Sequence, residues 1–407
     1  MLLTGARSYR AGAFHRAAEH LGIEIIPVVN MDAQLAEEWQ TDTGVDFERA
    51  DAAHVVAELA RAREVDAVLA VDDSGTLIAA QAASLLGLPH NDPSSAQAAR
   101  DKVIMRKRMS AGGVPCPWFR EFSTDLDPAI VAKEVPYPCV VKPTTLNGSR
   151  GVVRANDVTE FVSAVSRLSK ILRREFPGVD SSPYLVESFI PGVEVALEGL
   201  LDAGQLRVLA LFDKPDPLTG PFFEETIYVT PSRLDATVQQ SVADCVVLAA
   251  EALGLRTGPV HAELRVNEEG PWMLEVAGRS IGGLCSQTLR FGVAASLEEL
   301  IVRQACGLPI DMAERENSAS GVMMIPIPDA GMLRGVDGLD DALAIPDIES
   351  IEITAKLNYT ITPLPEGESY LGFIFARSNT PENVETALRQ AHRCLHFEIV
   401  PEFQLQI

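Results

Sequence analysis

Apolar residues in the first part of the chain recur with two different periods. Short apolar runs, each about as long as a buried strand, alternate with segments whose apolar residues have helical spacing. The runs are 1–5, 23–29 and 67–71, and the helical segments are 11–21, 52–63 and 76–86. Strands that alternate with helices predict a parallel sheet with helices on its faces. We therefore predict an N-terminal α/β domain over residues 1–96.

The turns of this domain contain one candidate site. The segment between Gly5 and Gly12 lacks the GxGxxG spacing that lets a pyrophosphate approach a helix N-terminus. Asp72 and Asp73 follow the third strand, at the carboxyl end where open α/β sheets place ligands. Capping of the next helix explains this pair equally well. Asp73 is therefore a candidate substrate residue, with capping as the alternative.

A basic helix and a proline-rich break follow. Residues 96–110 have helical spacing and carry Lys102, and the prolines at 115 and 117 oppose a helix because proline removes a backbone donor. The apolar run at 137–143 predicts a strand that carries Lys142 near its end. A lysine that leaves a strand into a loop can neutralise a phosphate.

The loop after this lysine consists of small residues and includes Asn147, Gly148 and Ser149. Its backbone N–H groups and hydroxyls could surround a phosphate. Asn-Gly is also a strong hairpin signal, so an ordinary hairpin is the alternative. The two interpretations are compatible, because a hairpin loop can close over a nucleotide.

The segment 184–199 predicts two strands joined by a Pro-Gly hinge. Glu187 and Glu194 flank the hinge, and Ile190 lies within it. The acids could accept hydrogen bonds from an amine and from ribose hydroxyls, and the apolar residue could contact a base. Solvated acids at strand ends are the alternative.

Residues 258–267 and 271–279 predict two strands joined by a tight turn. Alternate side chains of a strand share a face, so His261, Glu263 and Arg265 should point the same way, as should Glu275 and Arg279. Carboxylates beside guanidinium groups in an apolar hairpin suit a site for magnesium and phosphate. A ladder of structural salt bridges is the alternative.

Composition and charge narrow the function. The chain has 407 residues, of which 34 are basic and 57 acidic, and its formal net charge of −23 repels nucleic acid and anionic lipid. A small polyanion such as ATP remains a possible ligand despite this net charge. The 6 cysteines form no CxxC pair, as in a reduced cytosolic protein. Without a signal-peptide pattern or a run of about eighteen apolar residues, we expect a cytoplasmic protein that does not span a membrane.

The order of these motifs resembles that of the ATP-grasp superfamily, over residues 1 to about 310. The resemblance implies an α/β fold with an α+β grasp core. Its N-terminal parallel domain would occupy 1–96, and the nucleotide-binding domain 97–310, with a lid at about 114–186. A C-terminal α+β subdomain would occupy 311–407.

The resemblance implies that one group of residues binds ATP. The group is Lys102, Lys142, Asn147, Gly148, Ser149, Glu187, Ile190 and Glu194. The lysines would contact the phosphates, and the loop 147–151 would close over them. Glu187 would accept from the adenine amine, Ile190 would offer its backbone, and Glu194 would hold the ribose.

The resemblance also implies metal and catalytic residues on the hairpin. Glu263 and Glu275 would bind Mg²⁺ between the β- and γ-phosphates, and Arg279 would be the catalytic residue that steadies the transferring phosphoryl group or the acyl phosphate. Many relatives have an asparagine two residues after the second metal-binding glutamate, where this chain has Ala277. We therefore expect one or two ions, for which Mn²⁺ could substitute.

The segments 211–231, 282–287 and 311–407 look most like amino-acid ligases of the bacilysin and carnosine-synthase type. The resemblance implies an ADP-forming ligase that converts a carboxylate to an acyl phosphate and joins it to an amine, giving a dipeptide or an amide. Glu224 or Glu225 could receive the ammonium group of the first substrate, or form an acid pair at a strand edge. His261 could orient a metal ligand or touch the acyl phosphate, or be structural.

Two other functions are compatible with the sequence. One is a carboxylase-like or formyltransferase-like enzyme that activates bicarbonate or formate, and the other is an ATP-binding protein without turnover, to which Ala277 points. The expected partners are a small carboxylate, a small amine and a second copy of the chain, with neither nucleic acid nor membrane. The sequence does not identify the two substrates.

Overall fold

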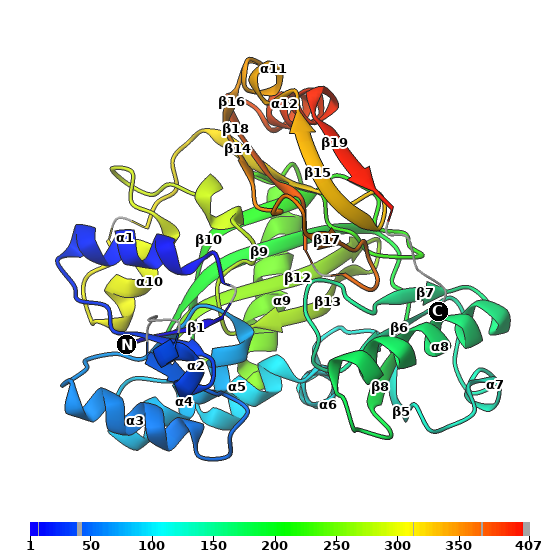
Figure 1. The fold of residues 1–407 in the computed structure, drawn as a ribbon, viewed down its shortest axis with the longest axis horizontal. Helices are drawn as coiled ribbons and strands as arrows, with labels where there is room; N and C mark the ends of the chain where they lie inside the picture. Colours follow the sequence, from blue (N-terminus) through cyan, green and yellow to red (C-terminus); the bar gives the residue numbers. More distant parts are fainter. Residues whose placement is uncertain (7, 39–42, 312, 368, 402–407) are drawn as a thin grey trace.

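The computed structural model describes residues 1–6, 8–38, 43–311, 313–367 and 369–401. Figure 1 shows an N-terminal α/β unit at one end, a small sheet with a long helix at the other, and a long antiparallel sheet between them that continues into the C-terminal unit. The predicted α/β class with an α+β grasp core is confirmed.

The N-terminal unit is built on a parallel sheet of strand order β3-β2-β1-β4. Its elements are β1 (Leu2–Gly5), α1 (Ala11–Leu21), β2 (Pro27–Asn30), α2 (Ala33–Glu38), β3 (Thr43–Val45), α3 (Ala52–Ala62), β4 (Leu69–Ala70) and α4 (Asp73–Leu86). The second strand was predicted at 23–29, but its ladder begins at Pro27. Ile23 and Ile25 instead pack against the central core of the molecule, which explains their apolar character.

The basic segment predicted as one helix forms two. α5 (Pro93–Arg100) ends at Asp101, and α6 (Lys102–Ala111) begins directly after it. The Asp101 carboxylate accepts hydrogen bonds from the backbone N–H groups of Val103 and Ile104, at 2.8 and 3.0 Å. Such an N-cap satisfies donors that have no partner in a new helix, and it starts α6 with Lys102 in the first turn.

A separate sheet of order β5-β8-β6-β7 carries the predicted phosphate loop. Its elements are β5 (Phe119–Ser123), α7 (Pro128–Val131), β6 (Cys139–Pro143), β7 (Val153–Ala155), α8 (Val158–Glu175) and β8 (Pro183–Ser188). Phe161 and Leu168 of α8 are fully buried in the core beside this sheet. This sheet and its helices also contact the C-terminal unit. Gly151 donates its N–H to the Pro365 carbonyl at 2.8 Å, and Arg167 pairs with Glu366 at 2.6 Å.

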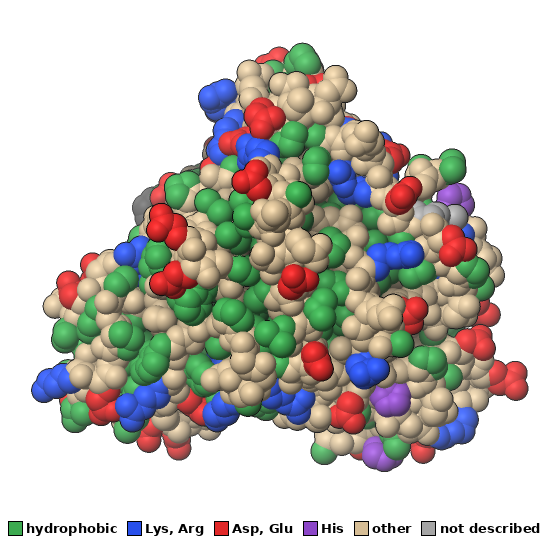
Figure 2. All heavy atoms as spheres, turned by 180° about the vertical axis from the view of Figure 1, so that it is seen from behind, with side chains coloured by type: hydrophobic (Ala, Val, Ile, Leu, Met, Phe, Trp, Pro, Cys, Tyr) green, Lys and Arg blue, Asp and Glu red, His purple; other side chains and the backbone are tan. Residues whose placement is uncertain are grey.

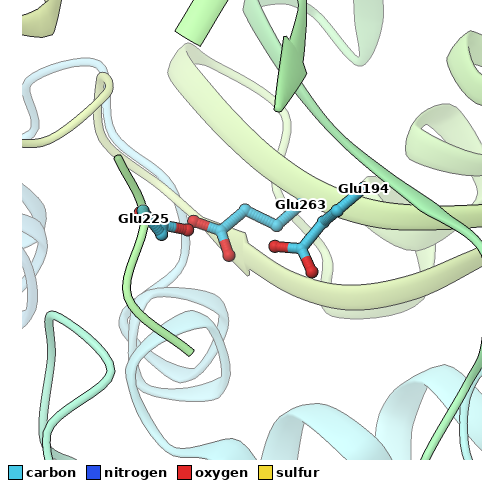
Figure 3. Close-up of side chains that lie close together, drawn as sticks. All are labelled: Glu194, Glu225 and Glu263. Carbon is cyan, nitrogen blue, oxygen red and sulfur yellow. The ribbon is translucent and has the colours of Figure 1, made fainter. Parts of the chain in front are cut away.

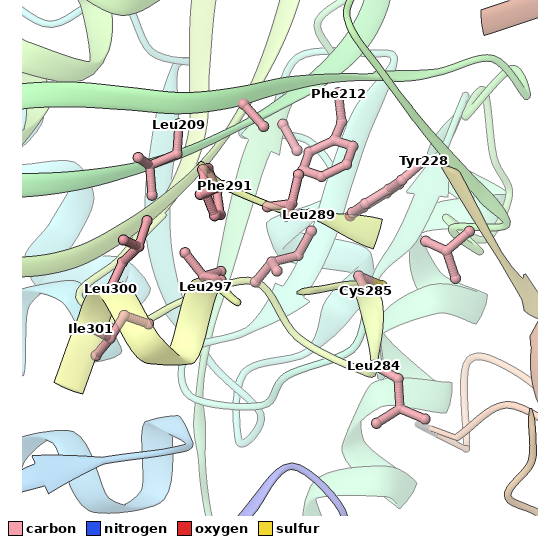
Figure 4. Close-up of a cluster of buried hydrophobic side chains, with 14 of the residues drawn as sticks. Leu209, Phe212, Tyr228, Leu284, Cys285, Leu289, Phe291, Leu297, Leu300 and Ile301 are labelled. Atoms are coloured by element: carbon pink, nitrogen blue, oxygen red, sulfur yellow. The ribbon is translucent and has the colours of Figure 1, made fainter. Parts of the chain in front are cut away.

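The central sheet is antiparallel throughout, with strand order β13-β12-β9-β10-β11-β14-β18-β16. Its first part and the adjoining helices are β9 (Val193–Asp202), β10 (Gln205–Lys214), β11 (Ile227–Thr230), α9 (Ala236–Leu253), β12 (Gly258–Asn267), β13 (Gly270–Ala277), the 3-10 helix η1 (Cys285–Thr288) and α10 (Leu297–Ala305). Leu209 and Phe212 of β10 pack with Phe291, Leu297 and Leu300 in one core (Figure 4). The same core includes Leu2 and Phe14 from the N-terminal unit, so it joins the two units.

The C-terminal unit extends this sheet and covers it. Its elements are β14 (Ala319–Ile325), β15 (Gly331–Asp337), α11 (Leu339–Leu343), β16 (Ile348–Ile353), β17 (Thr360–Ile361), β18 (Gly372–Ser378), α12 (Pro381–Cys394) and β19 (His396–Val400). β15, β17 and β19 form a further small sheet of order β17-β15-β19. Helix α12 buries Val384 and Leu388.

Acidic and basic side chains are interspersed on the face of the molecule shown in Figure 2, with apolar side chains between them. Among the described residues, no helix combines the length and the apolar character needed to cross a membrane.

Candidate active site

A cavity of about 350 Å³ opens where three parts of the molecule meet. They are the N-terminal unit, the sheet β5-β8-β6-β7, and the central sheet with its C-terminal extension. Most of the predicted site residues line the cavity, namely Asp73, Lys102, Lys142, Asn147, Gly148, Ser149, Glu187, Ile190, Glu194, Glu225, His261, Glu263, Glu275 and Arg279. Glu224 is not part of this lining. Adjacent side chains of a non-helical segment point in different directions, and Glu225 is the one that faces the cavity.

One end of the cavity is formed by a buried ion cluster between the sheet β5-β8-β6-β7 and α6. Lys142 Nζ lies 2.6 Å from Glu187 Oε2, and Arg106 Nε donates to Glu187 Oε1 at 2.6 Å. Burial lowers the pKa of Lys142. Burial alone would raise the pKa of Glu187, but Arg106 and Lys142 hold it below its usual value. Each oxygen of a carboxylate has two lone pairs, so Glu187 can still accept a bond from an adenine amine.

Lys102 connects the start of α6 to the floor of the cavity. Its Nζ donates to the Leu146 carbonyl at 3.0 Å and to Glu275 Oε1 at 3.2 Å. The loop after Lys142 turns at Gly148 and Ser149, whose φ angles of 61° and 54° are left-handed. Strands β6 and β7 pair on either side of this loop, so the hairpin is confirmed, and the loop lines the cavity as well.

The paired acids of the hairpin lie directly opposite one another. The β12–β13 register matches Glu263 with Glu275 and His261 with Ala277, and a register shift follows Glu263. Side chains opposite one another on a sheet face have Cβ atoms about 5 Å apart. Both carboxylates are half-buried and face the cavity, so this oxygen donor set fits a divalent cation such as Mg²⁺.

The two acids differ in their electrostatic surroundings. Burial alone would raise the pKa of Glu275, but Lys102 and Lys142 lower it to about 2. Burial raises the pKa of Glu263, and repulsion from Glu275 adds to this effect. A divalent cation between the two would offset that repulsion.

A buried lysine lies among three acids beside this hairpin. Oxygens of Glu194, Glu225 and Glu263 all lie within 4.8 Å of one another, and the three side chains point toward a common centre (Figure 3). Lys214 Nζ lies 2.9 Å from Glu194 Oε1 and 3.6 Å from Glu263 Oε2, and it contacts Glu225 Oε1. Burial would lower the pKa of Lys214, but the carboxylates hold it well above its usual value.

Arg279 and Asp73 close the opposite side of the cavity. Arg279 Nη2 lies 2.8 Å from Asp73 Oδ2, and its Nη1 donates to the Ser280 carbonyl at 3.0 Å. Asp73 is the first residue of α4, and the preceding Asp72 occupies the N-cap position without a side-chain capping bond. The Asp72 carboxylate instead accepts from the Gly5 N–H at 2.9 Å, so the capping alternative does not hold.

The wall beyond Glu225 is largely apolar or aromatic. It is formed by Tyr9, Tyr228, Ile281, Cys285, Met324 and Tyr370. Tyr228 donates its hydroxyl to Glu225 Oε2 at 2.8 Å. This part of the cavity therefore combines a half-buried carboxylate with space for an uncharged side chain.

Three family models match the chain. A model described as ATP-grasp domain matches residues 135–288, and one described as ATP-grasp N-terminal domain matches 14–90. A third, L-amino acid ligase C-terminal domain 2, matches 323–400. The chain belongs to the ATP-grasp superfamily. An ATP-grasp domain implies ATP binding.

Relatives of this ATP-grasp chain include two ligases. It is 26% identical over 272 residues to alanine–anticapsin ligase of Bacillus subtilis (strain 168), covering 62% of the chain and 57% of the relative. It is 27% identical over 358 residues to carnosine synthase 1 of Gallus gallus, covering 82% of the chain and 38% of the relative. The chain thus spans less than two thirds of either ligase.

A solved structure, that of an L-amino acid ligase from Bacillus licheniformis, matches with a TM-score of 0.80 and 25% identity. The match covers 99% of this chain and 98% of that one. The similarity therefore extends from the N-terminal unit to the C-terminal unit of this ATP-grasp chain.

The structure also adds residues to the site that the sequence did not assign. Arg106 is fully buried against Glu187, and Lys214 is buried among the acids. Both had a signal. Arg106 lies one helical turn after Lys102 and so shares its face, and Lys214 is the last residue of a strand, much as Lys142 is the last but one of another.

Proposed function

We propose that this protein is an ATP-dependent carboxylate–amine ligase that makes a dipeptide or an amide through an acyl phosphate. One observation supports this most strongly. The cavity combines a cluster of cations beside the paired acids Glu263 and Glu275 with a third, half-buried carboxylate, Glu225, which adjoins an aromatic wall. A reaction that activates one carboxylate and then accepts an amine needs both features.

The charges in the cavity suit the first half of this reaction. When a carboxylate attacks the γ-phosphate of ATP, two anions approach one another, so cations must offset their repulsion. Lys102, Lys142 and Arg279 all line the cavity and would hold the phosphates in line for attack. The Mg²⁺ ion expected at Glu263 and Glu275 would supply further positive charge on the phosphate oxygens.

The second half of the reaction requires exclusion of water, because an acyl phosphate hydrolyses readily. The loop at Asn147 to Ser149 lines the cavity, and the sheet β5-β8-β6-β7 that carries it would act as the predicted lid and close over the nucleotide. Glu225 would receive a substrate ammonium group, and the aromatic wall around Tyr228 and Tyr370 would accommodate its side chain. This assignment favours amino acids with apolar side chains among the substrates.

Release of ADP and phosphate from ATP tests the proposal directly. The purified protein would be assayed against pairs of amino acids, with each amino acid alone, bicarbonate and formate as controls. We expect release to require both a carboxylate and an amine, with an amide product visible by mass spectrometry. Release driven by bicarbonate or formate, or ATP binding without release for any pair, would contradict the proposal.

Replacement of Lys142 tests the nucleotide end of the cavity. Lys142→Ala should weaken ATP binding by about 1.5–3 kcal/mol, the usual contribution of a charge-assisted hydrogen bond. Calorimetric titration with an ATP analogue measures this loss. Lys133→Ala, at an exposed lysine in the same part of the chain, is the matched control and should bind normally. An unchanged affinity in Lys142→Ala would remove this lysine from the site.

A further inference from the structure

A row of three paired residues crosses neighbouring strands next to the proposed metal site. His261 on β12 is paired with Ala277 on β13 and, on its other side, with Glu198 on β9. His261 is 5% exposed and lines the cavity, and Glu198 is fully buried. The small side chain of Ala277 supplies no polar atom to the cavity, so the imidazole is the polar group of this row that reaches it.

The hydrogen bonds of Glu198 determine which ring nitrogen carries a proton. Glu198 Oε2 accepts from the backbone N–H of Ile281 at 3.0 Å, and His261 Nδ1 lies 3.0 Å from the same oxygen. When Glu198 is ionised, this oxygen accepts both bonds, and Nδ1 is the donor. In that tautomer Nε2 has a lone pair available for a metal ion, as in the carboxylate–histidine–metal arrangements of known metal sites.

His261 Nε2 lies 3.5 Å from Glu263 Oε1, on the cavity side of the ring. Two lone-pair atoms that face one another need a proton or a cation between them. Neighbouring ligands of an octahedral ion with bonds of about 2.1 Å lie about 3 Å apart, so small side-chain shifts would bring both atoms onto one ion.

We propose that His261 Nε2 is a ligand of the divalent ion held by Glu263 and Glu275, and that Glu198 positions the ring for this role. The inference rests on the proposed function, which places an ion at these acids. An imidazole among carboxylates is a mixed donor set, which favours Mn²⁺ or Co²⁺ relative to Mg²⁺ more than an all-oxygen site does. The ratio of Mn²⁺ affinity to Mg²⁺ affinity should therefore be larger for the wild-type protein than for His261→Gln.

Pulsed electron paramagnetic resonance of the Mn²⁺ complex with ADP tests the ligand. Protein labelled with ¹⁵N only at histidine distinguishes a histidine nitrogen from adenine and backbone nitrogens. We expect a ¹⁵N coupling of directly bound imidazole, which His261→Gln loses and the exposed control His54→Gln keeps. Circular dichroism of each variant shows whether it is folded.

The same spectra separate this inference from the proposed function. Phosphorus coupling to Mn²⁺ without histidine coupling in the wild-type protein would overturn the histidine ligand and leave the nucleotide–metal site intact. If the protein binds no Mn²⁺ beyond the amount that free ADP holds, both the histidine ligand and the proposed nucleotide–metal site are overturned.

The role of Glu198 is tested by two replacements. Glu198→Gln retains an acceptor for Nδ1 and should keep the histidine coupling. Glu198→Leu leaves the ring without its partner and should weaken Mn²⁺ binding about 10–100-fold, as for other groups that orient metal ligands. Equal Mn²⁺ affinity in the two variants would overturn the positioning role.

Discussion

Glu275→Gln is expected to reduce ADP formation about 10³-fold or more while the protein stays folded. The pKa of Glu275, held at about 2, means that its carboxylate is ionised at neutral pH and available as a charged metal ligand. Glutamine keeps the shape but removes the charge, and loss of several kcal/mol of electrostatic stabilisation corresponds to this fall in rate. Steady-state ADP release at saturating ATP and metal measures it.

The expected effect on stability is smaller and has a defined sign. A carboxylate with a lowered pKa stabilises the folded state above its ordinary titration range, and this contribution is lost as the pH falls toward 2. Glu275→Gln should therefore lower the melting temperature modestly at neutral pH. Lys102 keeps its bond to the Leu146 carbonyl, which limits the loss.

A matched control is available on the same hairpin. Glu268 is exposed in the turn between β12 and β13, so Glu268→Gln removes an equal charge away from the cavity and should retain full activity. Near-normal turnover of Glu275→Gln would refute the metal role of this acid. Loss of cooperative unfolding would show instead that the acid is needed for the fold.

The hairpin shows what could be predicted from local sequence. Alternation along 258–267 and the tight turn were sufficient to place His261, Glu263 and Glu275 on one side, because both signals act over a few residues. The register shift after Glu263 had no such signal. The start of β2 at Pro27 was also missed, because Ile23 and Ile25 are apolar through contacts with a distant core.

Partners brought together by the central sheet were beyond the reach of the sequence. Glu198 and His261 lie 63 residues apart and meet only because β9 pairs with β12. Lys214 reaches three acids that come from three different segments of the chain. Its place at the end of a strand was a usable signal, but the acids around it depend on non-local pairing, which a single sequence does not disclose.

Lys214→Met is expected to destabilise the protein by about 3–5 kcal/mol and to abolish turnover. Removal of one partner from a buried ion cluster leaves the remaining charges uncompensated, which costs about this much. The side chain of Lys214 is 2% exposed, so water cannot replace it easily. Chemical unfolding at neutral pH measures the loss, and Lys170→Met, at an exposed lysine, is the control.

The pH dependence of this loss identifies its cause. Burial and mutual repulsion already raise the pKa values of Glu225 and Glu263, and loss of the lysine should raise them further. Groups with a raised pKa bind protons more readily in the folded state, so their ionisation destabilises the fold as the pH rises through the raised values. The difference between variant and wild type should therefore be largest at neutral pH and shrink toward pH about 4, the ordinary carboxyl range.

A second replacement provides an independent check of the same cluster. Glu225→Gln removes one of the three charges, so the double variant Lys214→Met/Glu225→Gln should be more stable than Lys214→Met alone. Residues in one ion cluster are coupled, and the double-mutant cycle should show an interaction energy of about 1–3 kcal/mol. A loss in Lys214→Met that is independent of pH, together with additive effects in the cycle, would mean that the lysine contributes packing rather than charge.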